Sequence, residues 1–176
     1  FELEFYLIKR RNKLDENPTP PTSKRNKRQA EGTQVYGMSE LDDFYDFLED
    51  INKFCRIQNI PASTASSEFA PGQFEINLNS TVDLLKAADD SVLLRRLVKE
   101  TAINHGYEAT FLSKPYLGEA GNGMHLHLSL YDKNNKNIFS KNKLKNKNML
   151  HAIGGLQKTM YDSMAFFAPN INSYRR

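Results

Sequence analysis

The amino-acid sequence predicts an α+β domain whose curved sheet holds a polar site on its concave face. Short segments in which apolar and polar residues alternate indicate strands, and longer segments with a helical period lie between them. Several of these strands carry carboxylates or histidines on the face opposite their apolar side chains. The 176 residues are 39% hydrophobic and 26% charged, which is typical of a globular domain with a sizeable core.

The first strand is predicted at the start of the chain, in the segment "FELEFYLI". The apolar side chains on one of its faces are Phe1, Leu3, Phe5 and Leu7. The polar side chains on the other face are Glu2, Glu4 and Tyr6. Residues 9–37 contain several prolines and many charges, which predicts a long polar loop region within the domain.

A helix is expected after this loop, with Ser39 as its N-cap. Its apolar positions are Leu41, Phe44, Leu48, Ile51 and Cys55. The segment "EFAPGQFEINLN" then predicts a Pro-Gly turn that leads into a second alternating strand. In this strand the residues expected in the core are Phe74, Ile76 and Leu78, and those expected to point away are Gln73, Glu75 and Asn77.

The second half of the chain continues this succession of helices and strands. A long helix is expected over residues 81–105, closed by Gly106 in a left-handed conformation. A short strand over 108–114 and a glycine-rich turn over 115–123 precede a third alternating strand, "MHLHLSLYD". The last helix is expected over residues 149–167, and Pro169 ends it.

Four carboxylates and two histidines fall on these strands or at their ends. They are Glu2, Glu4, Glu68, Glu75, His125 and His127. Residues two apart on a strand share a face and lie about 6.5–7 Å apart, so Glu2 and Glu4 are presented together, as are His125, His127 and Ser129. Carboxylates gathered on one face repel each other unless a cation neutralises them.

The donor atoms of this group indicate which metal it would hold. Carboxylate oxygens with an occasional imidazole suit Mg²⁺ or Mn²⁺ better than Zn²⁺. Two or more such ions could bind substrate phosphates during phosphoryl transfer. Taken singly, a Glu-x-Glu or a His-x-His is more simply a solvated strand face. Their occurrence together on three strands, each with an apolar reverse face, favours the metal site.

Charge and cysteine content bear on other classes of protein. The basic residues cluster in two polar stretches, residues 9–28 and 133–148, and neither interleaves aromatics in the way that a base-stacking surface would. Solvated loops explain them better than a nucleic-acid site. The sequence has no apolar run long enough to span a membrane, and no phosphate-binding G-x-x-x-x-G-K motif. Cys55 is the only cysteine, which fits a reducing cytoplasm.

Four segments resemble, in order, the signature motifs of the glutamine synthetase catalytic domain. They are "FELEFYL", "SEFAPGQFEINL", "ATFLSKPYLGEAGNGMHLHLSL" and "NSYRR". Within that family, residues 68–115 look more like the γ-glutamylpolyamine synthetase branch than the nitrogen-assimilating enzymes. The resemblance implies a curved, mostly antiparallel sheet, a partial barrel, flanked by helices. It also implies that residues 1–176 are a partial catalytic domain, without the N-terminal domain and the C-terminal part, so that the fragment alone is expected to be inactive.

The resemblance assigns a role to each matching residue. Glu4, Glu68 and Glu75 match ligands of a metal near the glutamate and the attacking amine, and Glu2 and His125 match ligands of a second metal on the ATP phosphates. His127 and Ser129 match nucleotide contacts. Gly121 and Arg176 match the glutamate-binding residues. Arg176 is also the catalytic candidate, because its guanidinium can bind the glutamate α-carboxylate bidentately.

The activity that the resemblance implies is an ATP-dependent ligase that joins glutamate to an amine through γ-glutamyl phosphate. The amine is ammonia, giving glutamine, or a polyamine such as putrescine; Ala120, where glutamine-forming members usually carry Asn, favours the polyamine. Expected partners are glutamate, ATP, the amine and further copies of the chain, in a cytoplasmic homo-oligomer, a dodecamer, with sites shared between subunits. No nucleic acid or membrane partner is expected. The alternative is a non-catalytic member of the family with a structural or regulatory role.

Overall fold

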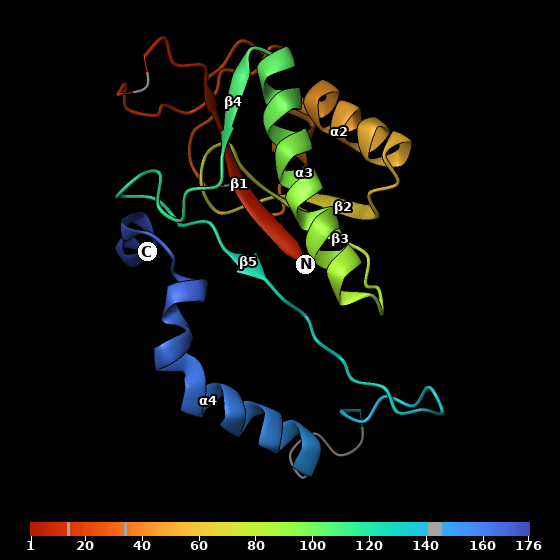
Figure 1. The fold of residues 1–176 in the computed structure, drawn as a ribbon. Helices are drawn as coiled ribbons and strands as arrows, with labels where there is room; N and C mark the ends of the chain where they lie inside the picture. The colour runs from red at the N-terminus through yellow and green to blue at the C-terminus, as the bar shows by residue number, and fades with distance from the viewer. Residues whose placement is uncertain (14, 34, 141–145) are drawn as a thin grey trace. The chain divides into compact units, whose positions relative to one another are not determined.

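Two compact units make up the computed structural model, which describes residues 1–13, 15–33, 35–140 and 146–176 (Figure 1). The first unit, Phe1–His125 with Arg175–Arg176, holds the sheet and three helices. The second, Leu126–Tyr174, holds helix α4 (Lys147–Phe167), and the 3₁₀ helix η2 (Ile171–Arg175) runs across the boundary in the sequence. Among the described residues no helix combines the length and apolar character needed to cross a membrane.

Strand β1 (Glu2–Lys9) lies at the centre of an open antiparallel sheet. The strand order is β2 (Ala62–Ser67), β3 (Gln73–Leu78), β1 and β4 (Tyr107–Thr110). The short strand β5 (Met124–His125) also pairs with β1. Since β4 pairs with residues 6–9 of β1 and β5 with residues 2–3, the chain leaves β1 after β4 and returns beside it at β5. The antiparallel sheet with helices confirms the predicted α+β class.

The core lies between the sheet and helices α2 (Tyr45–Ile57) and α3 (Leu84–Asn104), which cover one face (Figure 1). The sheet contributes Leu3, Phe5, Leu7, Phe74, Ile76 and Leu78 to this core. The alternation predicted for the first two strands is therefore confirmed. A smaller cluster on the other face of β1 contains the buried side chains Tyr6, Ile8 and Ala70, with Tyr116 and Ala120 packed against them.

The predicted first helix is interrupted at Phe44. Helix α1 (Met38–Asp43) follows Gly37 without a side-chain cap, so the prediction that Ser39 is the N-cap is wrong. Phe44 separates α1 from α2 with a φ of −117°, and its ring packs edge-on against Phe74 and Tyr107 with centroids 5.6 and 5.8 Å away. Burial of this aromatic ring in the core outweighs the continuity of the helix.

The remaining elements agree in part with the sequence. Helix α3 begins after Asp83, whose carboxylate accepts a hydrogen bond from the Lys86 amide (3.0 Å), and Gly106 has the expected positive φ of 74°. Helix α4 matches the last predicted helix. Strand β2, rich in Ser, Thr and Ala, was not predicted.

The third predicted strand is wrong beyond His125. Strand β5 contains only Met124 and His125, because β1 offers only Glu2 and Leu3 as pairing partners there. Residues 126–132 keep their alternating sequence but have no neighbouring strand in the described part of the chain, apart from an isolated bridge at Tyr131. The predicted strand over 108–114 is likewise shorter and is replaced by β4.

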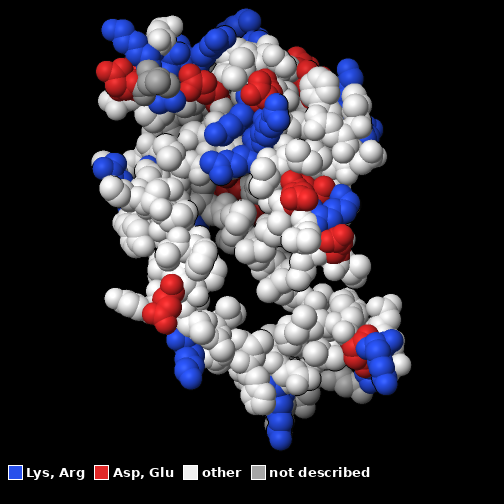
Figure 2. All heavy atoms as spheres, viewed as in Figure 1, with Lys and Arg blue, Asp and Glu red and all other residues white. Residues whose placement is uncertain are grey.

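The predicted loop region 9–37 begins one residue later than expected, since Lys9 ends β1, and residues 10–37 form turns and one isolated bridge, as far as the structure describes them. Their basic side chains are partly paired: Arg11 contacts Glu108 at 2.9 Å and Arg25 contacts Asp42 at 3.8 Å. Figure 2 shows Asp and Glu side chains interspersed with Lys and Arg on the face in view. Of the second basic stretch, residues 141–145 lie outside the described residues.

Candidate metal and substrate site

The strand register gathers four of the predicted metal ligands. Glu2 and Glu4 point to the same face of β1 because they are two residues apart. Glu4 lies opposite Glu75 in the β1–β3 pairing, and Glu2 lies opposite His125 in the β1–β5 pairing. Directly opposed residues have Cβ atoms about 4.5–5.5 Å apart. The side chains of three strands therefore meet on one face of the sheet.

Glu68 joins this group through the turn between β2 and β3. Its backbone N–H donates to the carbonyl of Gln73 (2.8 Å), and the Gln73 N–H donates to the carbonyl of Ala70 (3.0 Å). These bonds close a tight turn at Pro71-Gly72 and bring Glu68 back toward the start of β3. The negative charges of Glu75 and Glu4 act on the Glu68 carboxyl, so the turn residue shares their electrostatic environment.

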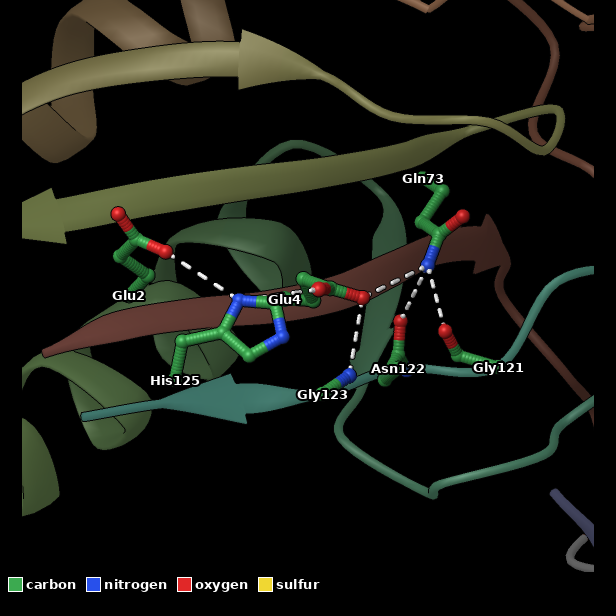
Figure 3. A network of polar contacts seen from close by, with 7 residues as sticks. All are labelled: Glu2, Glu4, Gln73, Gly121, Asn122, Gly123 and His125. Carbon is green, nitrogen blue, oxygen red and sulfur yellow. Dashed lines mark hydrogen bonds and ion pairs between the residues drawn. The ribbon is translucent and has the colours of Figure 1, made fainter. Parts of the chain in front are cut away.

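The distances within the group are those of a possible ion site. His125 Nδ1 lies 3.2 Å from Glu2 Oε2 and 3.9 Å from Glu4 Oε1 (Figure 3). Glu2, Glu75 and His125 each offer one ligand atom, and these three atoms lie within 4.8 Å of one another. Glu2, Glu4, Glu75 and His125 thus belong to a single cluster, as the sequence predicted.

The cluster perturbs its own carboxyl groups. Burial, followed by the charges of Glu75 and Glu4, raises the pKa of Glu68 to about 7. Burial and the charges of Glu2 and Glu4 also raise the pKa of Glu75. In both cases the charge of His125 acts in the opposite direction, but more weakly than burial. The negative charge gathered here is therefore only partly balanced by the surrounding side chains.

A divalent cation fits this arrangement. Charge of the opposite sign favours the ionised form of crowded carboxylates, and oxygen donors with one imidazole suit Mg²⁺ or Mn²⁺. Asn77, which follows Glu75 on the same face of β3, hydrogen-bonds the Glu75 carboxylate. Its Oδ1 is buried without a hydrogen-bond partner among the described residues. A hydrated ion beside Glu75 would supply a donor to such an acceptor.

Glu4 also contacts the loop over residues 113–123, called here the substrate loop. The Gly123 N–H donates to Glu4 Oε2 at 2.9 Å, and the Glu4 N–H donates to the Gly123 carbonyl at 3.1 Å. The buried side chain of Gln73 donates from Nε2 to the same Glu4 oxygen at 3.3 Å (Figure 3). Glu4 is only 8% exposed, and its carboxylate contacts both His125 of the carboxylate cluster and the loop.

Arg176 lies against the glycines of the substrate loop. A Cβ at Gly121 would lie 2.5 Å from the Ser113 carbonyl oxygen and 2.9 Å from Arg176 Cγ. A Cβ at Gly123 would lie 3.1 Å from both terminal guanidinium nitrogens of Arg176 and 3.1 Å from Glu4 Oε1. The structure therefore brings the predicted glutamate-binding residues Gly121 and Arg176 together beside Glu4.

His127 and Ser129 fall in the second compact unit, Leu126–Tyr174, and both are exposed there. The earlier grouping of His125, His127 and Ser129 on one strand face is wrong, since β5 ends at His125.

Three residues of the site were not recognised from the sequence. Gln73 was expected to point away from the core but is buried, and Asn122 and Tyr6 received no role. The signal for Gln73 was its place on the same strand face as Glu75, and for Asn122 its place between two glycines. Tyr6 shares a face with Glu2 and Glu4, and its hydroxyl donates to the Ala120 carbonyl at 2.6 Å.

Comparison with known proteins agrees with the geometry. The chain is 41% identical over 176 residues to "Gamma-glutamylputrescine synthetase PuuA" from Escherichia coli, covering 99% of this chain and 37% of that protein. It is 36% identical over 181 residues to "Type-1 glutamine synthetase 1" from Dictyostelium discoideum, covering 100% and 35%. Among solved structures it superposes on a GmaS/ADP complex with a TM-score of 0.80 at 29% identity, covering 99% of this chain and 39% of that one.

The chain thus spans a little over a third of the length of the relatives that it matches. The family model described as "Glutamine synthetase, catalytic domain" matches residues 1–176, the whole of the sequence. The matched region includes the three strands that gather the carboxylates and the loop that carries the glycines. The chain belongs to the glutamine synthetase catalytic-domain family.

Proposed function

We propose that the full-length protein is an ATP-dependent ligase that forms an amide between the γ-carboxylate of glutamate and an amine. The observation that supports this most directly is the cluster of Glu2, Glu4, Glu75 and His125 beside Glu68. Relatives at 41% and 36% identity are named as synthetases of γ-glutamylputrescine and of glutamine. A retired site would be expected to lack at least one of these ligand types, so the complete set argues against a non-catalytic role.

The metal ligands divide into two sets. Glu4, Glu68 and Glu75 would hold an ion beside the glutamate and the amine, and Glu2 and His125 would hold a second ion beside the ATP phosphates. Burial and then the neighbouring carboxylates raise the pKa of Glu68 and Glu75, which supports this, because a cation beside these carboxyls would offset both effects. The ions would be Mg²⁺ or Mn²⁺, two or more per site, and when bound they would neutralise the transferring phosphoryl group.

The substrates would be held by residues around the cluster. Arg176 would bind the glutamate α-carboxylate through its guanidinium, and Gly121 would let the backbone of the substrate loop approach the same substrate. The close packing of Arg176 against Gly121 supports a shared role in glutamate binding. His127 and Ser129 would contact the nucleotide, on the strength of the family motif alone.

The reaction would proceed in two steps. An oxygen of the glutamate γ-carboxylate attacks the γ-phosphorus of ATP, and ADP leaves. The amine nitrogen then attacks the γ-carbonyl carbon of γ-glutamyl phosphate, inorganic phosphate leaves, and the nitrogen loses a proton. By holding the α-carboxylate, Arg176 together with the substrate loop would place the γ-carboxylate in line with the γ-phosphate, and such positioning provides much of the rate enhancement.

The amine is proposed to be a polyamine such as putrescine rather than ammonia. Two observations support it: the 41% identity to a protein named for γ-glutamylputrescine synthesis, and Ala120 beside Gly121. The test is product analysis by mass spectrometry of the full-length protein with ATP, glutamate and either ammonia or putrescine. Amide formation with putrescine is expected, abolished by EDTA and restored by Mn²⁺. Glutamine as the sole product would refute the polyamine, and no product with any amine would favour the non-catalytic alternative.

The remaining expectations concern the assembly. The family suggests a cytoplasmic homo-oligomer, a dodecamer, in which neighbouring subunits complete each site. Light scattering of the full-length protein would give the mass, and a monomer with full activity would contradict shared sites.

A further inference from the structure

Gln73 is a buried polar residue to which the family motifs give no role. It is the first residue of β3, is 1% exposed, and lies opposite Tyr6 in the β1–β3 pairing. Its backbone closes the turn that holds Glu68, and two residues later β3 carries Glu75. Burying a primary amide is unfavourable unless its polar atoms find partners, so the partners of Gln73 indicate why it is there.

The side-chain amide of Gln73 lies among three acceptors. Nε2 is 3.3 Å from Glu4 Oε2, 3.2 Å from the Gly121 carbonyl and 3.0 Å from Asn122 Oδ1 (Figure 3). Its Oε1 accepts from the Ala70 N–H at 3.2 Å. One amide therefore connects the metal-side carboxylate of β1 with the backbone of the substrate loop.

Asn122 makes the loop end of this connection rigid. Its side chain is 5% exposed, and Nδ2 donates to the Leu112 carbonyl at 2.8 Å and the Thr110 carbonyl at 3.3 Å. Its backbone N–H donates to the Ser113 carbonyl at 2.8 Å. Asn122 thus ties the two ends of the substrate loop together, and Gln73 holds that frame against Glu4.

Glu4 divides its two oxygens between the loop and the cluster. Oε2 accepts from Gln73 Nε2 and the Gly123 N–H, while Oε1 lies 3.9 Å from His125 Nδ1. Oε1 is also the oxygen that a Cβ at Gly123 would meet, together with the Arg176 guanidinium. Because both oxygens belong to one planar carboxylate, a ligand that draws Oε1 toward itself would also alter the bonds that Oε2 makes to the loop.

We propose that Gln73 is a positioning residue that couples the two sites: through Glu4, Gly121 and Asn122 it makes divalent-metal binding and glutamate binding strengthen each other. The coupling rests on the proposed function, since it assumes that glutamate binds at Gly121 and Arg176. Coupling of this kind is reciprocal, so the factor by which glutamate tightens the metal equals the factor by which the metal tightens glutamate.

The variants that test this are Gln73→Glu and Gln73→Met in the full-length protein. Gln73→Glu keeps the shape and the Oε1 acceptor but replaces the donor that faces Glu4, Gly121 and Asn122. Gln73→Met keeps the volume and removes the polar atoms, and so serves if the charged variant folds poorly. The matched control is Gln58→Glu, the same substitution at an exposed position on the C-cap of α2.

The measurement is the Mn²⁺ dissociation constant by calorimetry, with and without saturating glutamate and without turnover. In the wild type and in Gln58→Glu, glutamate is expected to lower the Mn²⁺ dissociation constant by about fivefold or more, which is the lower end of the range for allosteric coupling. In both Gln73 variants the factor should approach one. A structural defect alone would weaken the binding of each ligand yet leave the coupling factor, the ratio of the Mn²⁺ dissociation constants without and with glutamate, unchanged.

Hydrogen exchange of the substrate loop gives a second readout that needs no ligand. Peptides covering residues 113–123 should exchange faster in the Gln73 variants than in the wild type or Gln58→Glu. A coupling factor retained in Gln73→Glu and Gln73→Met would overturn the proposal and leave the ligase function standing. A wild type that binds glutamate and Mn²⁺ independently would overturn the coupling alone, whereas a wild type that binds Mn²⁺ but no glutamate would contradict the ligase function as well.

Discussion

The Glu68 carboxyl is expected to give the metal-free protein a distinctive pH response. Its pKa is raised in the folded state from 4.5 to about 7, so the folded chain holds a proton that the unfolded chain has already released. The folded state therefore binds more protons over this range, and the free energy of unfolding falls as the pH rises from about 5 to about 7. The midpoint temperature of thermal unfolding, measured in EDTA, should therefore decrease across that pH interval and level off above it.

The control for this prediction is Glu68→Gln, which has the same shape and no proton to lose. Its midpoint should vary less with pH over the same interval. Added Mn²⁺ should raise the wild-type midpoint more at about pH 8 than at about pH 5, where the ion must displace the Glu68 proton. Equal pH profiles for the two proteins would show that another group is responsible.

Gly121 and Gly118 form a matched pair within the substrate loop. A Cβ at Gly121 would meet the Ser113 carbonyl oxygen at 2.5 Å and Arg176 Cγ at 2.9 Å, whereas a Cβ at Gly118 would meet nothing within 4 Å. Overpacking of this kind costs about 1–3 kcal/mol. In the full-length protein, Gly121→Ala should raise the KM for glutamate about tenfold or more, since tenfold is about 1.4 kcal/mol. Gly118→Ala should stay near the wild type.

The structural reason for the difference is the backbone oxygen. Arg176 has a flexible side chain that could move aside, but the Ser113 carbonyl is held by the Asn122 N–H and cannot move without opening the loop. A Gly121→Ala variant with an unchanged KM for glutamate would show that the loop tolerates this displacement and that Gly121 has no part in binding.

At the scale of whole elements, a pair of tyrosines joins strand β1 to the substrate loop. The Tyr6 hydroxyl donates to the Ala120 carbonyl at 2.6 Å, and the Tyr6 and Tyr116 rings pack edge-on with centroids 5.2 Å apart. The Tyr116 hydroxyl is buried without a hydrogen-bond partner among the described residues. The two tyrosines therefore differ in one respect: of the two hydroxyls, only that of Tyr6 has a hydrogen-bond partner among the described residues.

Removing each hydroxyl should accordingly affect stability differently. Tyr6→Phe leaves the Ala120 carbonyl without its donor and should lower the free energy of unfolding by about 0.5–1.5 kcal/mol. Tyr116→Phe removes an unsatisfied buried hydroxyl and should be neutral or stabilising. Urea denaturation of both variants provides the comparison. Equal losses would mean that Tyr116 has a partner that the rest of the protein supplies.

The sequence predicted correctly those strands that have one apolar face and a neighbouring strand with which to pair. Strands β1 and β3 alternate, and their polar faces contain Glu2, Glu4 and Glu75, so both the fold class and the composition of the cluster followed from local pattern. Residues 126–132 alternate equally well but are not a strand, because alternation describes side chains and a strand also needs a backbone partner.

Packing over long distances accounts for the other differences. Phe44 breaks a helix whose local sequence is continuous, because Phe74 and Tyr107 surround its ring. Gln73 has the polar character of its strand face, yet the substrate loop covers it and turns a surface amide into a buried one. Neither contact partner is near in the sequence, so no local pattern could reveal them.

At the scale of the whole molecule, the two units differ in the stability and the metal binding that each would be expected to retain by itself. The carboxylates and His125 all lie in Phe1–His125, where strand pairing and the core hold them. Helix α4 has no buried residue, and its exposed apolar side chains include Leu150, Ile153, Leu156, Phe166 and Phe167. A helix whose apolar side chains are exposed in this way is expected to be marginal in water. Stability and metal binding should therefore depend mainly on the first unit.

Residues 1–176 expressed alone should consequently bind Mn²⁺ without forming an amide. The ligands are positioned by the register of β1, β3 and β5, but the chain spans only 37% of the γ-glutamylputrescine synthetase that it resembles, and catalysis needs the whole site. Calorimetry with Mn²⁺ should give a saturable isotherm that Glu75→Gln weakens by about tenfold or more, the range found when a ligand or its support is lost. Gln157→Glu on α4 is the control and should bind as the wild type does. Amide formation from ATP, glutamate and putrescine by residues 1–176 alone would contradict the prediction of inactivity. If residues 1–176 fold but do not bind Mn²⁺, the assignment of the cluster as a metal site is contradicted.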